Sequence, residues 1–399
     1  MTASFVYDAV RTPFGRYGKA LSGARPDDLA ALVLSEIVAR HPELDTARID
    51  DVILGDANAA GEDNRNVGRM ASLLAGFPTS VPGSTVNRLC GSGIEAIIQA
   101  SRAIETGDAE LILAGGVESM SRAPWVLLKP SRGYPSGHET LHSTTLGWRM
   151  VNPRMPGQWT VPLGETAEIL ADRYSISREQ QDEFALASHL KAAAAWDAGV
   201  YDGEIVAVPG TNLNRDEGIR ADSTLEVLAG LKPAFRSRGT VTAGNSSPLN
   251  DGAGALIIGS ENSPIGSEPL ARIVSRGVSG VDPDVFGIGP VEAANRALAK
   301  AGKSWADVDV VELNEAFASQ SLACLQLWPE LDPAKVNIHG GAIAMGHRAG
   351  ASSATSPTNL SAAAEVSALP QSASESARAS RLCWSGEREP RRGDRIGRG

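Results

Sequence analysis

One cysteine stands where a short apolar run meets a glycine-rich turn, a position suited to chemistry. In the segment VNRLCGSGIEAIIQA, Cys90 is the first residue of CGSG, which opens an amphipathic run. A helix that begins there is expected to lower the pKa of Cys90 and to favour the thiolate. Gly91 and Gly93 leave room for a ligand and expose backbone N–H groups that can stabilise an oxyanion. Taken alone, the pattern fits either a nucleophile or a small buried structural cysteine.

A histidine and an asparagine at two other turns could assist such a thiol. His347 follows a glycine in NIHGGAIAMGHRAGAS, where it is either a base toward the thiol or an ordinary surface histidine. His339, in the same segment, is interpreted as structural or as a residue that supports the site without direct contact with the substrate. LNEAFA places Asn314 and Glu315 after an apolar run, in a position to hold a water or to orient an imidazole. A helix N-cap is the alternative for Asn314.

The composition is that of a globular protein without nucleic-acid or membrane partners. The 399 residues exceed what one hydrophobic core usually supports, so two or three subdomains are expected. A formal net charge of −10 argues against nucleic-acid binding. The start MTASFVYDAV lacks the basic and apolar regions of a signal peptide, so none is expected, and no apolar stretch approaches the ~20 residues of a membrane span. The three cysteines have no metal-like spacing and fit a reducing cytoplasm, where we expect this protein.

Strand-like and helix-like segments alternate, which predicts an α/β fold. DDLAALVLSEIVARH is expected to be a helix that leads into the strand of IDDVILGDANAA. The order returns in PVEAANRALAKAG and ADVDVVELNEAFA, which indicates two similar halves. Between the halves, residues 121–242 are rich in residues that favour loops, and a capping box at SREQ predicts a helix there.

Several motifs together resemble one enzyme family. NRLCGSG, GGVESMSRAP, TAGNSSPLNDGAGAL, LNEAF and GGAIAMGH occur in the order and approximate spacing of the thiolases, the acetyl-CoA C-acyltransferases. The likeness covers residues 1 to about 350. GEDNRNVGRMA and WRMVNPRMP are most similar to the β-ketoadipyl-CoA and acetoacetyl-CoA branch of the degradative thiolases.

The resemblance implies a fold of two duplicated βαβαβαββ halves stacked as five αβαβα layers. The N-terminal half is expected over residues 1–120 together with 243–270, and the C-terminal half over 271–350. Residues 121–242 are expected to form an inserted subdomain of loops that covers the substrate.

The resemblance also implies roles for four residues. Cys90 would carry the acyl group as a thioester, and His347 would activate it. Asn314, through a bound water, would help His347 hold the thioester oxygen. Ser247, in GNSSPLND, matches a position that contacts the pantetheine of coenzyme A. The implied reaction is cleavage of 3-ketoacyl-CoA by CoA, or condensation of two acetyl-CoA. Acyl-CoA and CoA are then the partners, with no other cofactor and no metal, in a homodimer or homotetramer.

The C-terminal segment departs from the family pattern. The family moves a proton at the α-carbon of acetyl-CoA with a second cysteine, in a segment like CIGVGQG that this chain lacks. Residues 351–399 are Ser/Ala/Arg-rich and are expected to be disordered. Cys383 is not expected to substitute for the missing thiol, and Cys324 is expected in the core.

A change of reading frame is compatible with the missing family ending. Permitted codons for residues 370–386, read two bases later, spell AVCIGVGQGIALVLEW. We therefore hypothesise that the reading frame shifts between about residues 348 and 365. Sequencing of the gene tests this, and the absence of those codons would refute it.

The sequence is compatible with two other functions. One is a decarboxylating or acyl-carrier condensing enzyme of the same fold. Such enzymes usually pair their cysteine with two histidines or with His and Asn, and the pairing of LNEAF with GGAIAMGH argues against this. The other is a catalytically impaired, thiolase-like subunit without the second cysteine. Iodoacetamide labelling of Cys90 without turnover would favour that function.

Overall fold

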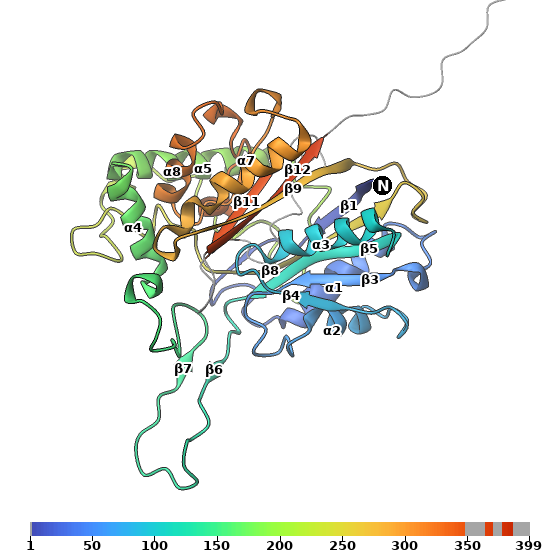
Figure 1. The fold of residues 1–399 in the computed structure, drawn as a ribbon, viewed down its shortest axis with the longest axis horizontal. Helices are drawn as coiled ribbons and strands as arrows, with labels where there is room; N and C mark the ends of the chain where they lie inside the picture. The colour runs from blue at the N-terminus through green and yellow to red at the C-terminus, as the bar shows by residue number, and fades with distance from the viewer. Residues whose placement is uncertain (1, 348–363, 370–376, 386–399) are drawn as a thin grey trace, which may run out of the picture.

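The computed structural model describes residues 2–347, 364–369 and 377–385. Figure 1 shows a curled sheet covered by helices, with a long loop that extends away from it. The strand order is β10-β11-β12-β9-β1-β8-β5-β3-β4, and β2 pairs with β8. These strands are β1 (Ser4–Arg11), β2 (Gly15–Arg16), β3 (Asp51–Gly55), β4 (Ser84–Val86), β5 (Leu111–Ser119), β8 (Asn250–Ser260), β9 (Ala271–Val281), β10 (Glu312–Leu313), β11 (Ala364–Leu369) and β12 (Ala377–Ser385).

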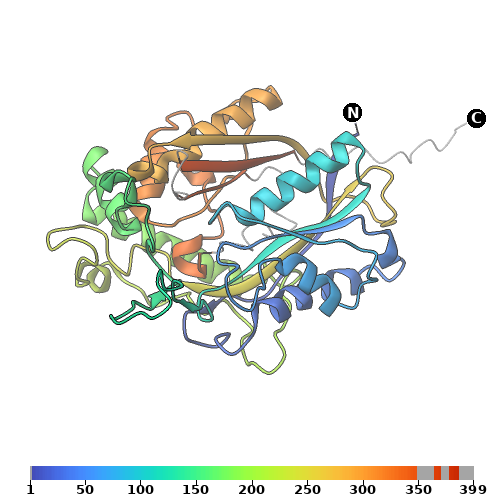
Figure 2. The ribbon, with the colours of Figure 1, turned by 60° about the horizontal axis from the view of Figure 1, so that its bottom comes forward.

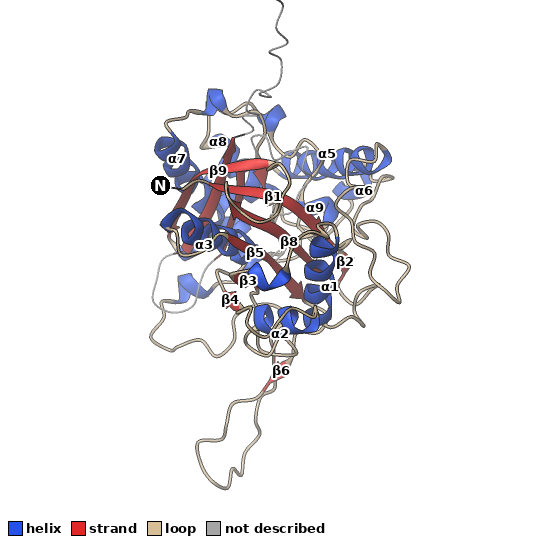
Figure 3. Ribbon diagram, turned by 90° about the vertical axis from the view of Figure 1, so that its right-hand side faces the viewer, coloured by secondary structure: helices blue, strands red, loops and turns tan. Residues whose placement is uncertain are grey.

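Alternating residues of the N-terminal strands bury opposite faces of the sheet. Val52 and Leu54 of β3 pack with α1 (Pro26–Ala39) and α2 (Val67–Leu74). Ile53 packs on the other side with α3 (Ser92–Thr106). A strand that is buried on both faces needs a continuous apolar run, which explains the sequence DVILG. Figure 3 shows α1 and α3 on opposite sides of the strands.

The second half of the chain repeats this order and joins the first edge to edge. Antiparallel pairing of β1 with β9 connects the two halves. The helices α7 (Gly289–Ala301), α8 (Ala318–Gln326) and α9 (Ala342–Met345) follow β9 as α1, α2 and α3 follow β1. Short 3-10 helices lie at η1 (Thr46–Arg48), η3 (Pro283–Ile288), η4 (Trp305–Asp307) and η5 (Pro333–Lys335). The predicted α/β class is confirmed, and Figure 2 shows α3 between strands of the two halves.

The chain between β5 and β8 consists mainly of loops and helices, with one pair of short strands. The strands β6 (Trp125–Val126) and β7 (His142–Ser143) flank the projecting loop of Figure 1. They are followed by η2 (Gly157–Thr160), α4 (Leu163–Arg173), α5 (Arg178–Asp197) and α6 (Leu225–Ala229). The capping box predicted at the start of α5 is confirmed, because Ser177 and Gln180 bond each other's backbone N–H. The domain boundaries themselves stay a prediction.

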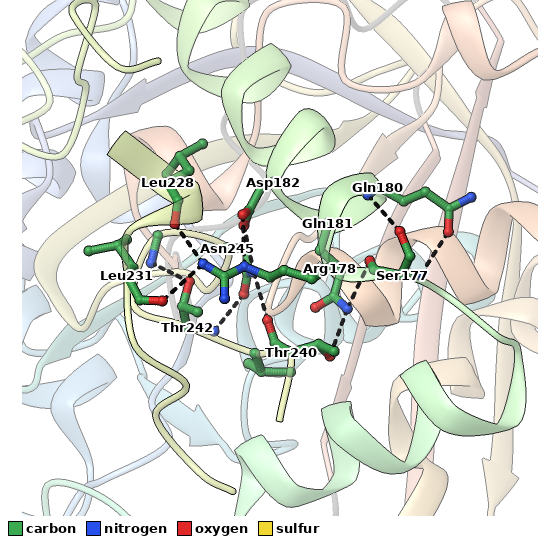
Figure 4. Close-up of polar contacts among 12 residues, drawn as sticks. Ser177, Arg178, Gln180, Gln181, Asp182, Leu228, Leu231, Thr240, Thr242 and Asn245 are labelled. Atoms are coloured by element: carbon green, nitrogen blue, oxygen red, sulfur yellow. Dashed lines mark hydrogen bonds and ion pairs between the residues drawn. The ribbon is translucent and has the colours of Figure 1, made fainter. Parts of the chain in front are cut away.

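Polar contacts attach the start of α5 to the chain that leads into Ser247. Arg178 Nε lies 2.7 Å from Asp182 Oδ2. Asn245 is fully buried, and its amide donates to Asp182 Oδ1 at 2.9 Å and to the carbonyl of Thr240 at 3.1 Å (Figure 4). A buried amide with its hydrogen bonds satisfied stabilises the loop that carries it.

Two strands lie in the segment that was expected to be disordered. β12 pairs antiparallel with β9 and β11, and β11 pairs parallel with β10. The prediction of disorder is wrong for these two segments. Composition fails as a guide here because a ladder of backbone hydrogen bonds along the edge of β9 depends little on side-chain type. Residues 351–363, 370–376 and 386–399 of the predicted tail lie outside the described residues.

Gly55, the last residue of β3, lies directly against the start of α3. A Cβ at Gly55 would lie 2.2 Å from the backbone carbon of Ser92, so the turn that carries Cys90 would have to shift. We expect Gly55→Ala to lower the free energy of unfolding by ~1–3 kcal/mol. Gly133→Ala is the matched control, because its added Cβ meets nothing within 4 Å. Urea unfolding measures both, and equal effects would contradict the packing argument.

Candidate active site

Cys90 lies between β4 and α3, in a turn that neighbouring side chains hold in place. Leu89 has a positive φ of 50°, an uncommon conformation for a residue with a large side chain. Ser92 Oγ accepts a hydrogen bond from Arg88 N at 2.9 Å and donates one to Leu89 O at 2.5 Å. Asn87 Oδ1 accepts from Leu89 N at 2.9 Å. These bonds stabilise the turn that places Cys90 at the start of α3, and the predicted strand–turn–helix is confirmed.

The structure brings Cys90, His347 and Asn314 together from three distant parts of the chain. Cys90 Sγ lies 3.6 Å from His347 Nδ1. At the other ring nitrogen, His347 Nε2 lies 3.0 Å from Asn314 Nδ2. The backbone carbonyl of His339, in the same segment as His347, accepts a hydrogen bond from the Tyr201 hydroxyl at 3.0 Å. The side chains of Cys90, His347 and Asn314 can therefore act as one unit.

Burial keeps Cys90 and His347 neutral at rest. Burial and the nearby Glu118 carboxyl raise the pKa of the Cys90 thiol well above its ordinary value. Burial lowers the pKa of His347 to about 4. The expected thiolate at the helix N-terminus is therefore wrong for this state, because desolvation outweighs a helix dipole worth ~0.3–2 kcal/mol. The resting pair is a thiol beside a neutral imidazole, which is the form that accepts a proton.

The raised pKa of Cys90 predicts how its alkylation depends on pH. Iodoacetamide reacts with thiolate, so the rate at Cys90 is expected to be low at pH 7 and to be still rising at pH ~9. Cys324 is fully buried and should stay unmodified in the folded protein. Mass spectrometry of timed samples measures both rates. A plateau at Cys90 below pH ~8 would mean that the thiolate already exists at rest, and would contradict the burial argument.

Glu118 belongs to a buried carboxyl cluster near Cys90. Burial raises the pKa values of Glu118 and Asp56, and repulsion from Asp63 raises both further. Glu118 Oε2 also accepts a hydrogen bond from Ala57 N at 3.0 Å. The cluster therefore holds protons near neutral pH, which limits the negative charge beside the thiol. Sequence reasoning gave Glu118 no role, although it lies in the motif GGVESMSRAP.

Glu315 attaches the loop after β10 to the start of α9. Its buried carboxylate accepts hydrogen bonds from Ser188 Oγ at 2.7 Å, from Asn337 Nδ2 at 2.7 Å and from Ile343 N at 3.1 Å. Because Asn314 directly precedes Glu315 and α9 leads to the histidine, these bonds help to set the distance between the two catalytic candidates. Asn314 is not a helix cap, since α8 begins at Ala318 with Phe317 at its N-cap.

Ser247 lies against the same loop. Its backbone N–H and its hydroxyl both donate to the carbonyl of Ala316, each at 3.1 Å. The hydroxyl oxygen can still accept a hydrogen bond from a ligand. The pantetheine contact expected of Ser247 stays a prediction.

The part of the chain that the structure describes holds no candidate metal centre and no candidate membrane span. No three His, Cys, Asp or Glu side chains there lie together in a way that could hold a metal ion. No helix among those residues is long and apolar enough to cross a membrane. Cys90 and Cys324 are both free thiols, and Cys324 is buried in α8 as predicted.

Comparison with known proteins decides the family. The thiolase N-terminal domain matches residues 4–262, and the thiolase C-terminal domain matches residues 267–384. The chain belongs to the thiolase family. A β-ketoadipyl-CoA thiolase of Escherichia coli is 53% identical to this thiolase over 365 residues, which cover 89% of this chain and 91% of the relative. A β-ketoadipyl-CoA thiolase of Pseudomonas putida is 51% identical over 360 residues, covering 88% and 90%.

Solved structures agree with this assignment. Human mitochondrial 3-ketoacyl-CoA thiolase superposes on this thiolase with a TM-score of 0.89 at 36% identity, over 97% of this chain and 99% of that chain. The same human enzyme in complex with CoA gives a TM-score of 0.88 at 37% identity, over 96% and 98%. The predicted thiolase fold is confirmed. This thiolase is an acyltransferase, and a different condensing enzyme of the same fold is not favoured.

Proposed function

We propose that this thiolase cleaves 3-oxoacyl-CoA substrates whose acyl chain ends in a carboxylate, of the β-ketoadipyl-CoA type. The substrate class is supported by the relatives of that name at 53% and 51% identity. The acyl-transfer chemistry rests on the 3.6 Å contact between Cys90 Sγ and His347 Nδ1, with Asn314 at the other ring nitrogen.

In the first half-reaction the Cys90 thiol passes its proton to His347 Nδ1 while Sγ attacks the 3-oxo carbonyl carbon. This requires the ring proton on Nε2. The Asn314 amide must then be flipped from the orientation that places its Nδ2 3.0 Å from Nε2, so that its oxygen accepts from that N–H. The C2–C3 bond breaks, and its electron pair stays on C2 of the departing acetyl-CoA, which takes up a proton. The proton held by His347 replaces the one that C2 takes, so the imidazole is neutral again for the second half-reaction. The remaining acyl group stays on Sγ as a thioester.

In the second half-reaction the thiol of free CoA attacks this thioester and gives its proton to His347. Cys90 leaves as a thiolate and recovers a proton from the imidazolium. We assign Asn314, through a water, and His347 to the thioester oxygen, where hydrogen-bond donors stabilise developing charge. Ser247 is assigned to the pantetheine of CoA. CoA and side chains supply this chemistry, so we propose no resident cofactor or metal.

The proton taken up by C2 is the one that the family delivers from its second cysteine. The chain as given lacks that segment, and we propose that restoring the shifted frame restores it. A frame-restored chain is then expected to catalyse thiolysis faster than the chain as given. Equal rates would mean that the second cysteine is dispensable or replaced.

We also propose a homodimer or homotetramer in the cytoplasm. Large apolar side chains are exposed on and beside the loop between β6 and β7, which is typical of surfaces that bind another subunit. They include Trp125, Leu127, Leu128, Tyr134 and Leu141. A nucleophilic thiol and the thiol of CoA both require reducing conditions, which supports the cytoplasm. Light scattering of the purified chain tests the assembly, and a monomer would contradict it.

Rates with two substrates test the proposed substrate class. We expect kcat/KM for β-ketoadipyl-CoA to exceed that for acetoacetyl-CoA by about tenfold or more, measured as CoA-dependent loss of 3-oxoacyl-CoA absorbance. Preference for acetoacetyl-CoA would contradict the proposed substrate class, in which the acyl chain ends in a carboxylate. It would not contradict the proposed acyl-transfer reaction. Acylation of Cys90 without turnover of either substrate would point to the altered C-terminal segment.

A further inference from the structure

Asn250, the first residue of β8, contacts the peptide group of His347. Its Oδ1 accepts a hydrogen bond from His347 N at 3.0 Å. Its Nδ2 donates to the carbonyl of Gly15 in β2, also at 3.0 Å. The side chain is buried, with 4% of the residue exposed. One amide therefore connects the chain near the N-terminus with the histidine of the other half.

The partners fix which way this amide is oriented. A carbonyl such as that of Gly15 can only accept a hydrogen bond, and the N–H of His347 can only donate one, so oxygen and nitrogen of Asn250 are assigned without ambiguity. The chain before the histidine passes directly over the amide. Gly346 has a φ of 123°, and a Cβ there would lie 2.5 Å from Asn250 Nδ2. Only glycine permits so close an approach in this conformation.

The contact connects His347 to the sheet on which α3, the helix after Cys90, packs. β8 packs against α3 through Leu256 and Ile258, and α3 begins directly after the turn of Cys90. A bond from the first residue of β8 to the histidine peptide therefore fixes the imidazole relative to the thiol. Among the described residues, the ring contacts Asn314 through Nε2 and Cys90 through Nδ1.

We propose that Asn250 is a positioning residue, which holds the His347 imidazole at the distance from Cys90 that proton transfer requires. The proposal rests on the proposed roles of Cys90 and His347. Misplacement of a catalytic group by ~1 Å can cost about 10²-fold in rate. Loss of the Asn250 amide is expected to slow acylation of Cys90 by about 10–10²-fold, with little change in substrate affinity.

Acylation of Cys90 by acyl-CoA in a single turnover is the readout, followed by mass spectrometry of the intact protein. Asn250→Ala should be slowed in the wild-type background, and should cause no further slowing in a His347→Gln background, because it acts through that histidine. Further slowing in the His347→Gln background would show a merely structural effect and overturn the proposal, as would an unchanged rate of Asn250→Ala.

Asn250→Asp adds a second readout through pH. A protonated carboxyl can donate to Gly15 O and accept from His347 N as the amide does, whereas a carboxylate cannot donate. Acylation by Asn250→Asp, relative to wild type, should therefore be best at low pH and fall as pH rises. A ratio that is flat or rises with pH would contradict the proposal.

Asn245 provides the matched control, since it is also a buried asparagine with a fully bonded amide. Its partners are Asp182 and Thr240, in α5 and the loop beside it (Figure 4). Asn245→Ala is expected to lose stability, and its loop leads to Ser247, so acyl-CoA is kept at saturating concentration. Under that condition it is expected to acylate at the wild-type rate per folded molecule. Equal slowing in both asparagine variants would overturn a specific role for Asn250. A wild-type chain that is not acylated at Cys90 would instead refute the proposed function itself.

Discussion

Serine in place of Cys90 is expected to lower kcat/KM for thiolysis by at least ~10⁴-fold. A hydroxyl is far less acidic than a thiol, and His347, whose pKa lies at about 4, is too weak a base to activate it. The acyl group would also be held as an oxygen ester, which reacts less readily with the thiol of CoA. The rate of loss of 3-oxoacyl-CoA absorbance measures the effect, with circular dichroism to verify the fold.

Cys324→Ser is the matched control for this experiment. Cys324 is buried even more deeply than Cys90, and its Sγ donates to the carbonyl of Gly287 at 3.2 Å, a bond that a serine hydroxyl can also make. Its kcat/KM is expected to stay near the wild-type value. Full activity of Cys90→Ser, or equal losses in both variants, would be incompatible with Cys90 as the acyl carrier.

Replacing His347 by glutamine is expected to slow thiolysis by about 10²–10⁴-fold, the usual contribution of a general base. Glutamine can occupy the space of the ring, but it cannot take the proton of Cys90. Because burial lowers the pKa of His347 to about 4, its base form persists down to that pH. The activity that depends on His347 should therefore be lost only as pH falls through about 4, and not near the ordinary histidine pKa.

His189→Gln separates this catalytic effect from the effect of losing a buried histidine. Burial lowers the pKa of His189 to about 4 as well, and its Nδ1 accepts a hydrogen bond from Arg220 N at 3.2 Å. Glutamine can accept the same bond, so kcat is expected to stay close to wild type. If His189→Gln were as slow as His347→Gln, the loss would reflect damage to the fold.

Local patterns in the sequence were sufficient to predict the elements around the nucleophile. Apolar periodicity predicted α1 and β3, and the glycine-rich turn at Cys90 predicted the start of α3. The meeting of Cys90, Asn314 and His347 could not be derived from spacing, because the cysteine and histidine are 257 residues apart. The family resemblance supplied that prediction, and the structure confirms that the three side chains meet.

The predictions that were wrong or missing concern features that depend on contacts between distant parts of the chain. The pKa of Cys90 was predicted in the wrong direction because the helix end is a local feature, whereas burial arises from the packing of distant segments. β12 was missed because its pairing with β9 uses backbone groups, which composition does not describe. Asn250 was missed because its partner, the peptide N–H of His347, lies 97 residues away.

Transfer of an acyl group to the protein is the most direct test of Cys90 as the acyl carrier. Incubation with acetyl-CoA in the absence of free CoA requires only attack by Cys90 and departure of CoA, so the result does not depend on the missing second cysteine. Intact-mass and peptide mass spectrometry should find one acetyl group, attached to Cys90 and removed when free CoA is added. An unmodified Cys90 in the folded protein, or an acetyl group on another residue, would contradict the account.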